Sequence, residues 1–175
     1  MERKPDWLKV RYNGDAVNEV AEIMRDMGLN TVCKEANCPN LGECYKKHTA
    51  TFMILGNICT RNCKFCNVTT GRPLPPDENE PENVAKAAKK LGLRHVVLTC
   101  STRDDLADGG AEHFAKTVRA IRKICPGATV ETLISDMKMN TDALDIIADV
   151  HPDVINHNVE TVKELQKAVR PQADY

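Results

Sequence analysis

The chain has 175 residues, of which 24 are basic and 25 acidic, so its formal net charge is −1. A hydrophobic content of 42% and a charged content of 28% are typical of a globular protein, and the near-zero charge argues against nucleic-acid binding through basicity alone. No apolar run approaches the roughly 20 residues that cross a bilayer. No secretory signal is visible at the N-terminus, so we expect a cytoplasmic protein without a membrane anchor.

The predicted elements alternate between helix and strand. Apolar residues at helical spacing predict helices over 15–27, 81–91, 111–124, 142–149 and 161–169, the last beginning at a capping box, Thr161-x-x-Glu164. Short aliphatic runs predict strands over 51–55, 95–99, 128–134 and 153–156. Residues 29–50 show no periodicity and are interpreted as a loop. Four prolines within 71–81 exclude regular structure there.

Four strand–helix pairs predict an α/β fold in which helices cover a parallel sheet. Such units either curl into a barrel or stay open, and the periodicity does not decide between the two. In both cases ligands gather at the carboxyl ends of the strands. Four units are too few for a closed eight-stranded barrel. We therefore expect a partial (β/α) barrel over 51–175, preceded by an N-terminal extension over 1–50 that carries a helix and a cysteine-bearing loop.

Six of the eight cysteines fall into two groups, and in a reducing compartment dense thiols indicate metal ligands rather than disulfides. The second cysteine group, Cys59, Cys63 and Cys66, directly follows a predicted strand with the spacing C-x3-C-x2-C. Three sulfur ligands suit iron–sulfur or zinc. On a 4Fe–4S cube they would leave one iron open for a substrate. The alternative is a structural zinc site completed by His48 or a distant cysteine.

The first cysteine group is Cys33, Cys38 and Cys44, with the spacing C-x4-C-x5-C in a segment turned by Pro39 and Gly42. It again offers three thiolates. The two groups flank one predicted strand, so six thiols could hold two clusters close together.

With the words around them, these groups resemble lipoyl synthases of the radical S-adenosylmethionine (SAM) superfamily. The matching words are EANCPNLGEC at 35–44, ATFMILG at 50–56, RDDLADGGA at 103–111 and NHNVETV at 156–162. The resemblance runs from about Trp7 to the last residue. It implies a radical-SAM barrel, of which about four βα units are present.

The resemblance also implies two 4Fe–4S clusters and SAM as cofactors. The second cysteine group would hold the cluster that binds and cleaves SAM, and the first group an auxiliary cluster that donates sulfur. The substrate would be an octanoyl chain on a lipoyl-carrier domain, with electrons from an external donor. In the family a serine in an Arg-Ser-Ser-Tyr word is the fourth ligand of the auxiliary cluster. That word is missing here, so we expect the N-terminal portion of a longer protein.

Polar side chains near the ends of the later strands are candidates to contact SAM: Thr99, Ser101, Arg103, Asp104, Glu131, Asn156 and Asn158. Each has a plainer interpretation as part of a solvated capping loop, an outward-facing glutamate or a turn-forming asparagine. Cys100 and Ser135 depart from the family's usual words, which leaves the local SAM contacts open.

Arg61 and Lys64, inside the second group, either offset the charge of a cluster or are solvated. The sequence identifies no catalytic residue. Another radical-SAM reaction, or a non-catalytic iron–sulfur or zinc module, are the alternative functions.

Overall fold

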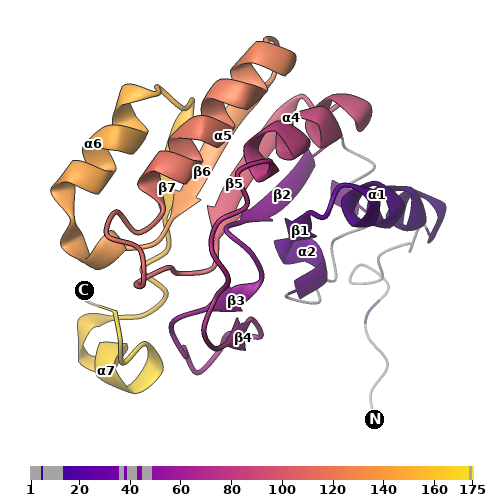
Figure 1. The fold of residues 1–175 in the computed structure, drawn as a ribbon. Coiled ribbons are helices and arrows are strands. Elements are labelled where there is room, and N and C mark those ends of the chain that lie inside the picture. Colours follow the sequence, from indigo (N-terminus) through magenta and orange to yellow (C-terminus); the bar gives the residue numbers. More distant parts are fainter. Residues whose placement is uncertain (1–4, 6–13, 36–37, 39–42, 45–48, 174) are drawn as a thin grey trace.

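The computed structural model describes residue 5 and residues 14–35, 38, 43–44, 49–173 and 175. It shows a twisted sheet flanked by helices (Figure 1). In spatial order the five strands are β1 Asn30–Thr31, β2 Thr49–Ile54, β5 His95–Cys100, β6 Thr129–Ile134 and β7 Val154–His157. β2, β5, β6 and β7 pair in parallel, and β1 pairs antiparallel to β2. The predicted α/β fold with a mostly parallel sheet is confirmed.

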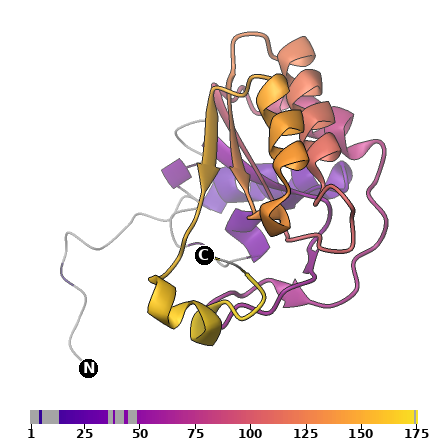
Figure 2. The ribbon, with the colours of Figure 1, turned by 90° about the vertical axis from the view of Figure 1, so that its left-hand side faces the viewer.

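The connections between the parallel strands run through helices on one side of the sheet. Helices α4, α5 and α6 all lie on this side (Figure 2). The helices are α1 Gly14–Asp26, α2 Val32–Glu35, α4 Glu80–Lys90, α5 Ala111–Ile124, α6 Thr141–Asp149 and α7 Gln166–Val169, with 3-10 turns at Met137–Met139 and Lys163–Leu165. None of the helices described is both long and apolar enough to cross a bilayer.

The hydrophobic core lies between the sheet and these helices. Val96 and Leu98 of β5 are fully buried and share one cluster with Phe114 and Ile121 of α5. The spacing of two within the strand puts Val96 and Leu98 on the same face, as a half-buried strand requires. Residues of α1 such as Ile23 belong to the same cluster, so the N-terminal helix contributes to the core of the sheet.

The opposite face of the sheet carries a mixture of apolar and polar side chains. Residues paired across neighbouring strands share a face. The register therefore aligns Thr51, Val97, Glu131 and Val154 in one row and Met53, Thr99, Leu133 and Asn156 in the next. The second row lies nearer the carboxyl ends of the strands.

Two predictions of secondary structure are wrong, and in addition α4 begins at Glu80, inside the 71–81 segment that was expected to lack regular structure. Residues 30–35, expected to be loop, form β1 and α2. The helix expected over 161–169 is replaced by a 3-10 turn and the four-residue α7, and the N-cap of the turn is the extended Val162, with no side-chain hydrogen bond, so the capping box does not form. Val162 and Leu165, two apolar residues of the expected helix, are 55% and 52% exposed.

Candidate functional site

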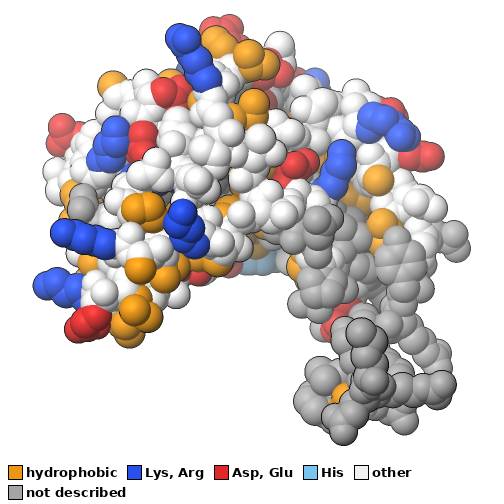
Figure 3. Space-filling view, turned by 90° about the horizontal axis from the view of Figure 1, so that it is seen from below, with side chains coloured by type: hydrophobic (Ala, Val, Ile, Leu, Met, Phe, Trp, Pro, Cys, Tyr) orange, Lys and Arg blue, Asp and Glu red, His pale blue; other side chains and the backbone are white. Residues whose placement is uncertain are grey.

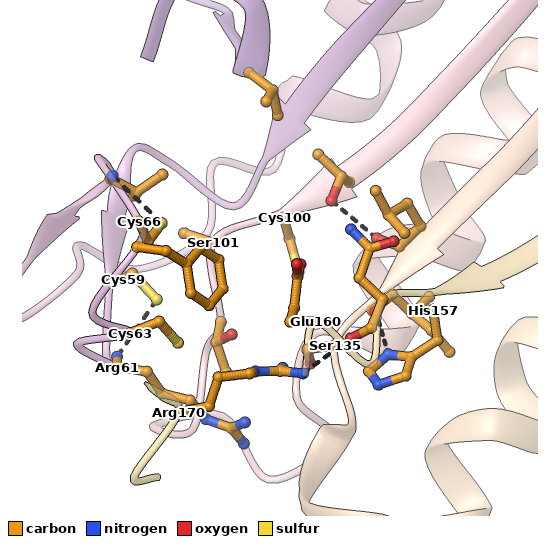
Figure 4. Close-up of a pocket in the computed structure, with 18 of the residues that line it drawn as sticks. Cys59, Arg61, Cys63, Cys66, Cys100, Ser101, Ser135, His157, Glu160 and Arg170 are labelled. Carbon is orange, nitrogen blue, oxygen red and sulfur yellow. Dashed lines mark hydrogen bonds between the residues drawn. The ribbon is translucent and has the colours of Figure 1, made fainter. Parts of the chain in front are cut away.

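A pocket of about 260 Å3 lies where the parallel strands end. The second cysteine group lines one side of it, His157 lies on the opposite side, and Arg170 and Glu160 lie between them (Figure 4). Seen from below, basic and hydrophobic side chains are exposed on the same face, on the side of the molecule where α7 lies (Figure 3). The pocket therefore joins the loop after β2 to the segment after β7.

The second cysteine group lies in a loop closed by two short strands. β3 Ile58–Cys59 pairs in parallel with β4 Thr69–Thr70, a small sheet that the sequence did not predict. The Arg61 amide donates to Cys59 Sγ at 3.4 Å, and the Val68 amide donates to Cys66 Sγ at 3.5 Å. Amide donors of this kind are also found around the sulfurs of iron–sulfur clusters.

In the described part of the chain, no three His, Cys, Asp or Glu side chains are arranged around a single metal ion. A 4Fe–4S cluster makes a different demand, because each thiolate binds a different iron and the sulfurs surround a cube. The three thiols border one pocket and interact with one another, since Cys66 and Cys59 both contribute to raising the pKa of Cys63. This donor set fits a cluster with three protein ligands.

Burial is the main cause that raises the pKa of the Cys63 thiol, and Arg170 opposes it through hydrogen bonding and charge. Arg170 is 9% exposed, and its Nη1 donates to the carbonyls of Asn158 and Val159 at 2.9 and 3.1 Å. Its Nε is buried without a hydrogen-bond partner among the groups the structure describes. An unpaired buried donor is costly, so a bound anionic or sulfur-containing group would stabilise it.

The C-terminal segment is attached directly to the cysteine loop. The Lys64 amide donates to the Val169 carbonyl at 2.9 Å, and the Asn62 amide donates to Gln172 Oε1 at 2.7 Å. These contacts bring Arg170 to the pocket although it lies far from the cysteines in sequence.

Arg61, at the wall of the pocket, holds three loops together. Its Nε and Nη2 donate to Asp104 at 2.7 and 2.9 Å, and its Nη1 and Nη2 donate to Asp136 at 2.6 Å each. Burial alone would raise the pKa of Asp136, but the Arg61 guanidinium holds it below its usual value. Arg61 is 3% exposed, so it is not solvated, and its guanidinium, one of the groups that line the pocket, is already paired with two carboxylates.

Three of the predicted SAM contacts line the pocket: Thr99, Ser101 and Asn158. Thr99 Oγ1 donates to the Leu133 carbonyl at 2.9 Å, and Ser101 Oγ donates to the Gly56 carbonyl at 3.2 Å. Both hydroxyl oxygens can still accept a hydrogen bond from a ligand.

The other four do not line it. Arg103 is 1% exposed, and Asp104 has both oxygens on Arg61. Glu131 accepts from Asn156 Nδ2 at 3.2 Å and lies 3.2 Å from His95 Nε2. These three side chains form a polar row on the open face of the sheet.

Sequence reasoning missed several lining residues, among them His157, Glu160 and Arg170. His157 Nδ1 lies 2.8 Å from the Ile134 carbonyl, which can only accept, so Nδ1 carries a proton. Nε2 is then the acceptor of the neutral ring. Glu160 has a left-handed backbone with φ 70°. The available signal was the NHNVETV word at the end of a strand, from which only the asparagines were chosen.

The first cysteine group begins in α2, in a segment that contacts the loop of the second group. Cys33 is buried in α2, the Cys38 amide donates to the Cys33 carbonyl at 3.0 Å, and Cys44 is partly exposed. Residues 36–37 and 39–42 of this loop, and His48, lie outside the described residues. Asn67 Nδ2, next to Cys66, donates to the Glu35 carbonyl at 2.9 Å, which joins the two cysteine segments.

Comparison with known families agrees with this arrangement. A family model described as the Radical SAM superfamily matches residues 53–175, which include the second cysteine group and every strand from β5 onward. The chain belongs to the radical SAM superfamily. Membership implies a 4Fe–4S cluster and SAM, and the three thiols at the pocket are a donor set that fits such a cluster.

Several curated relatives of this radical SAM chain are named lipoyl synthases. The protein of Caldanaerobacter subterraneus is 58% identical over 99% of the chain and 61% of its own length. Those of Rubrobacter xylanophilus and Chromobacterium violaceum are 56% and 50% identical over 98% and 99% of the chain, and over 54% and 56% of their own lengths. The resemblance based on the cysteine words is confirmed, and the chain spans little more than half the length of these relatives.

Proposed function

We propose that this chain is the cluster-binding part of a lipoyl synthase, which inserts sulfur into a protein-bound octanoyl chain. The identity of 50–58% to lipoyl synthases supports this. The observation that carries the proposal is the contact from Asn67 to Glu35, which puts the two cysteine segments side by side. A reaction that generates a carbon radical and captures it with sulfur needs its two reactive groups close together.

In this proposal the second cysteine group binds a 4Fe–4S cluster with one open iron, and the first group binds an auxiliary cluster. With SAM bound and an electron from an external donor, the cluster held by the second cysteine group would supply a 5′-deoxyadenosyl radical. Thr99, Ser101 and Asn158 would bind polar groups of SAM in the pocket. Arg170 would place its unpaired Nε toward the ligand or the sulfur of Cys63.

The remaining predicted SAM contacts receive indirect roles. Arg103 and Asp104 would fix the loop that contains the second cysteine group, since their partners are Leu55 and Arg61. Glu131 and Asn156 lie on the open face of the sheet, outside the pocket, where they would face a substrate that extends beyond it.

We also propose that the sheet is part of a (β/α) barrel, with 51–175 as the barrel part and 1–50 as the extension that carries the first cysteine group. The substrate would be an octanoyl chain on a lipoyl-carrier domain, as the relatives' name suggests. No role in nucleic-acid or membrane binding is proposed. Cytoplasmic placement would keep the thiol ligands reduced.

Anaerobic reconstitution with iron and sulfide tests the proposal. Two triple alanine variants remove one cysteine group each, and Cys125→Ala, outside both groups, is the matched control. Removing the second group should abolish reductive SAM cleavage and the SAM-induced change in the electron paramagnetic resonance spectrum. Removing the first group should spare both and lower the iron bound by up to about four atoms. One zinc and no iron in the wild-type chain would overturn the proposal in favour of a zinc module.

Formation of lipoyl product distinguishes a lipoyl synthase from an enzyme with another radical-SAM reaction. The product is measured with the full-length protein and an octanoylated carrier domain. The first-group variant should cleave SAM without making lipoyl product. Lipoyl product from that variant would contradict the role of the first group as the sulfur donor site.

A further inference from the structure

The second cysteine group is connected to the sheet through a backbone turn that is unfavourable for the residue that makes it. Leu55 follows β2 directly and has φ 67°, in the left-handed region that a leucine rarely adopts. Gly56 continues with φ 86°. Cys59 follows three residues later, so the conformation of this turn sets where the cysteine loop begins.

Both polar groups of the Leu55 backbone are held by buried side chains. Its amide donates to Glu80 Oε2 at 2.8 Å, and its carbonyl accepts from Arg103 Nη1 at 3.0 Å. The Gly56 carbonyl accepts from Ser101 Oγ at 3.2 Å. Left-handed conformations of ordinary residues persist only when their surroundings impose them, and these three contacts do so.

Glu80 is itself held in place by a side chain of the neighbouring helix α5. It is the first residue of α4 and is 6% exposed, and its Oε2 lies 2.7 Å from His113 Nε2 of α5, which is 8% exposed. A buried carboxylate is stable only with hydrogen-bond donors around it. Here the Leu55 amide and the His113 ring both reach the same oxygen.

We propose that Glu80 and His113 are positioning residues for the second cysteine group: together they hold the Leu55 amide, and with it the left-handed turn that places Cys59 at the pocket. The inference rests on the proposed function, because the position of Cys59 matters only if Cys59 binds the cluster. The hydrogen bonds themselves do not depend on a cluster. Neither residue lines the pocket, so they act through the backbone and not by contact with a ligand.

Three variants test this. Glu80→Leu removes the acceptor, and Glu80→Gln keeps one oxygen that can accept from both donors. Glu82→Gln is the matched control, because Glu82 lies on the same helix in an exposed pair with Lys86 at 2.8 Å. The first readout is hydrogen–deuterium exchange of the 53–58 peptide in the cluster-free chain. The second is the dissociation constant of SAM and the resonance spectrum of the reduced, reconstituted chain.

Glu80→Leu should raise exchange at the Leu55 amide by about tenfold or more and weaken SAM binding by a similar factor, because a hydrogen bond to a charged acceptor is lost. Glu80→Gln should stay within about threefold of the control, since its oxygen still accepts. If Glu80→Leu does not fold by circular dichroism, His113→Phe replaces it. That variant removes only the support of Glu80, and a smaller rise in exchange is expected.

If Glu80→Leu folds but exchanges the Leu55 amide and binds SAM as the wild-type chain does, the inference is overturned. Equal losses in Glu80→Gln and Glu80→Leu would also overturn it, because charge and not the acceptor would then matter. Where His113→Phe is used, exchange equal to the control overturns it. Failure of the wild-type chain to bind a cluster would instead refute the proposed function, because the exchange measurement needs no cluster.

Discussion

Replacing Gly110 with alanine should destabilise the chain mainly through one contact with Leu55. Gly110 has φ +94°, and a Cβ built there would lie 2.3 Å from Leu55 Cδ1. Leu55 is 2% exposed, so its methyl group cannot move into solvent. A side chain in the left-handed region costs roughly 1–2 kcal/mol, and overpacking a core adds about 1–3 kcal/mol. The expected loss in the free energy of unfolding is therefore about 2–5 kcal/mol.

Gly28→Ala separates the two contributions, because Gly28 has φ +66° but no atom within 4 Å of its built Cβ. Urea unfolding of the cluster-free chain, followed by circular dichroism, should show that Gly110→Ala loses about 1–3 kcal/mol more than Gly28→Ala. In a Leu55→Ala background this extra loss should largely disappear, since Cδ1 is gone. Equal losses for the two glycine variants would refute the steric reasoning.

Arg61→Gln should cost about 3–5 kcal/mol of unfolding free energy, because the buried carboxylate of Asp136 and the partly buried carboxylate of Asp104 lose their partner. Arg119→Gln, in an exposed pair, should cost less than about 0.5 kcal/mol. The lowered pKa of Asp136 stabilises the fold at neutral pH and is lost as pH falls through that lowered value, so acid urea titrations should show a shallower loss in Arg61→Gln. Burial raises the pKa of Cys100 to about 12, so iodoacetamide at about pH 8 should label it far more slowly than the exposed Cys66, as peptide mass spectrometry would report; equal rates would contradict this.

The layered fold could be predicted because its elements follow local patterns. α5 has the predicted bounds, and Pro81 lies in the first turn of α4 as expected. The last helix could not be predicted in the same way. Its Thr161-x-x-Glu164 word is a local signal, but α7 depends on distant contacts, such as the bond from the Lys64 amide to the Val169 carbonyl. Tertiary contacts outweighed a capping preference worth about 1 kcal/mol.

The candidate site was predictable only where chemistry follows from spacing. The second cysteine group could be found because its ligands lie in one loop. The surrounding side chains come from four strand ends, and sequence order does not tell which of them point into the cavity. Ser101 lines it, whereas Arg103, two residues on, turns away to donate to the Leu55 and Leu74 carbonyls.

The charge balance of the pocket depends on which of its charged side chains already have ion-pair partners. Arg61 lies within the second cysteine group, but its guanidinium is paired with the carboxylates of Asp104 and Asp136, so the trio has a net charge of −1. Arg170 donates to backbone carbonyls and has no ion-pair partner in the described part of the chain, so it keeps its positive charge beside Cys63. A cluster bound by three thiolates would bring negative charge to this place. Arg170 would be well placed to stabilise that charge, and its distance from the cysteines in sequence gave no indication of this.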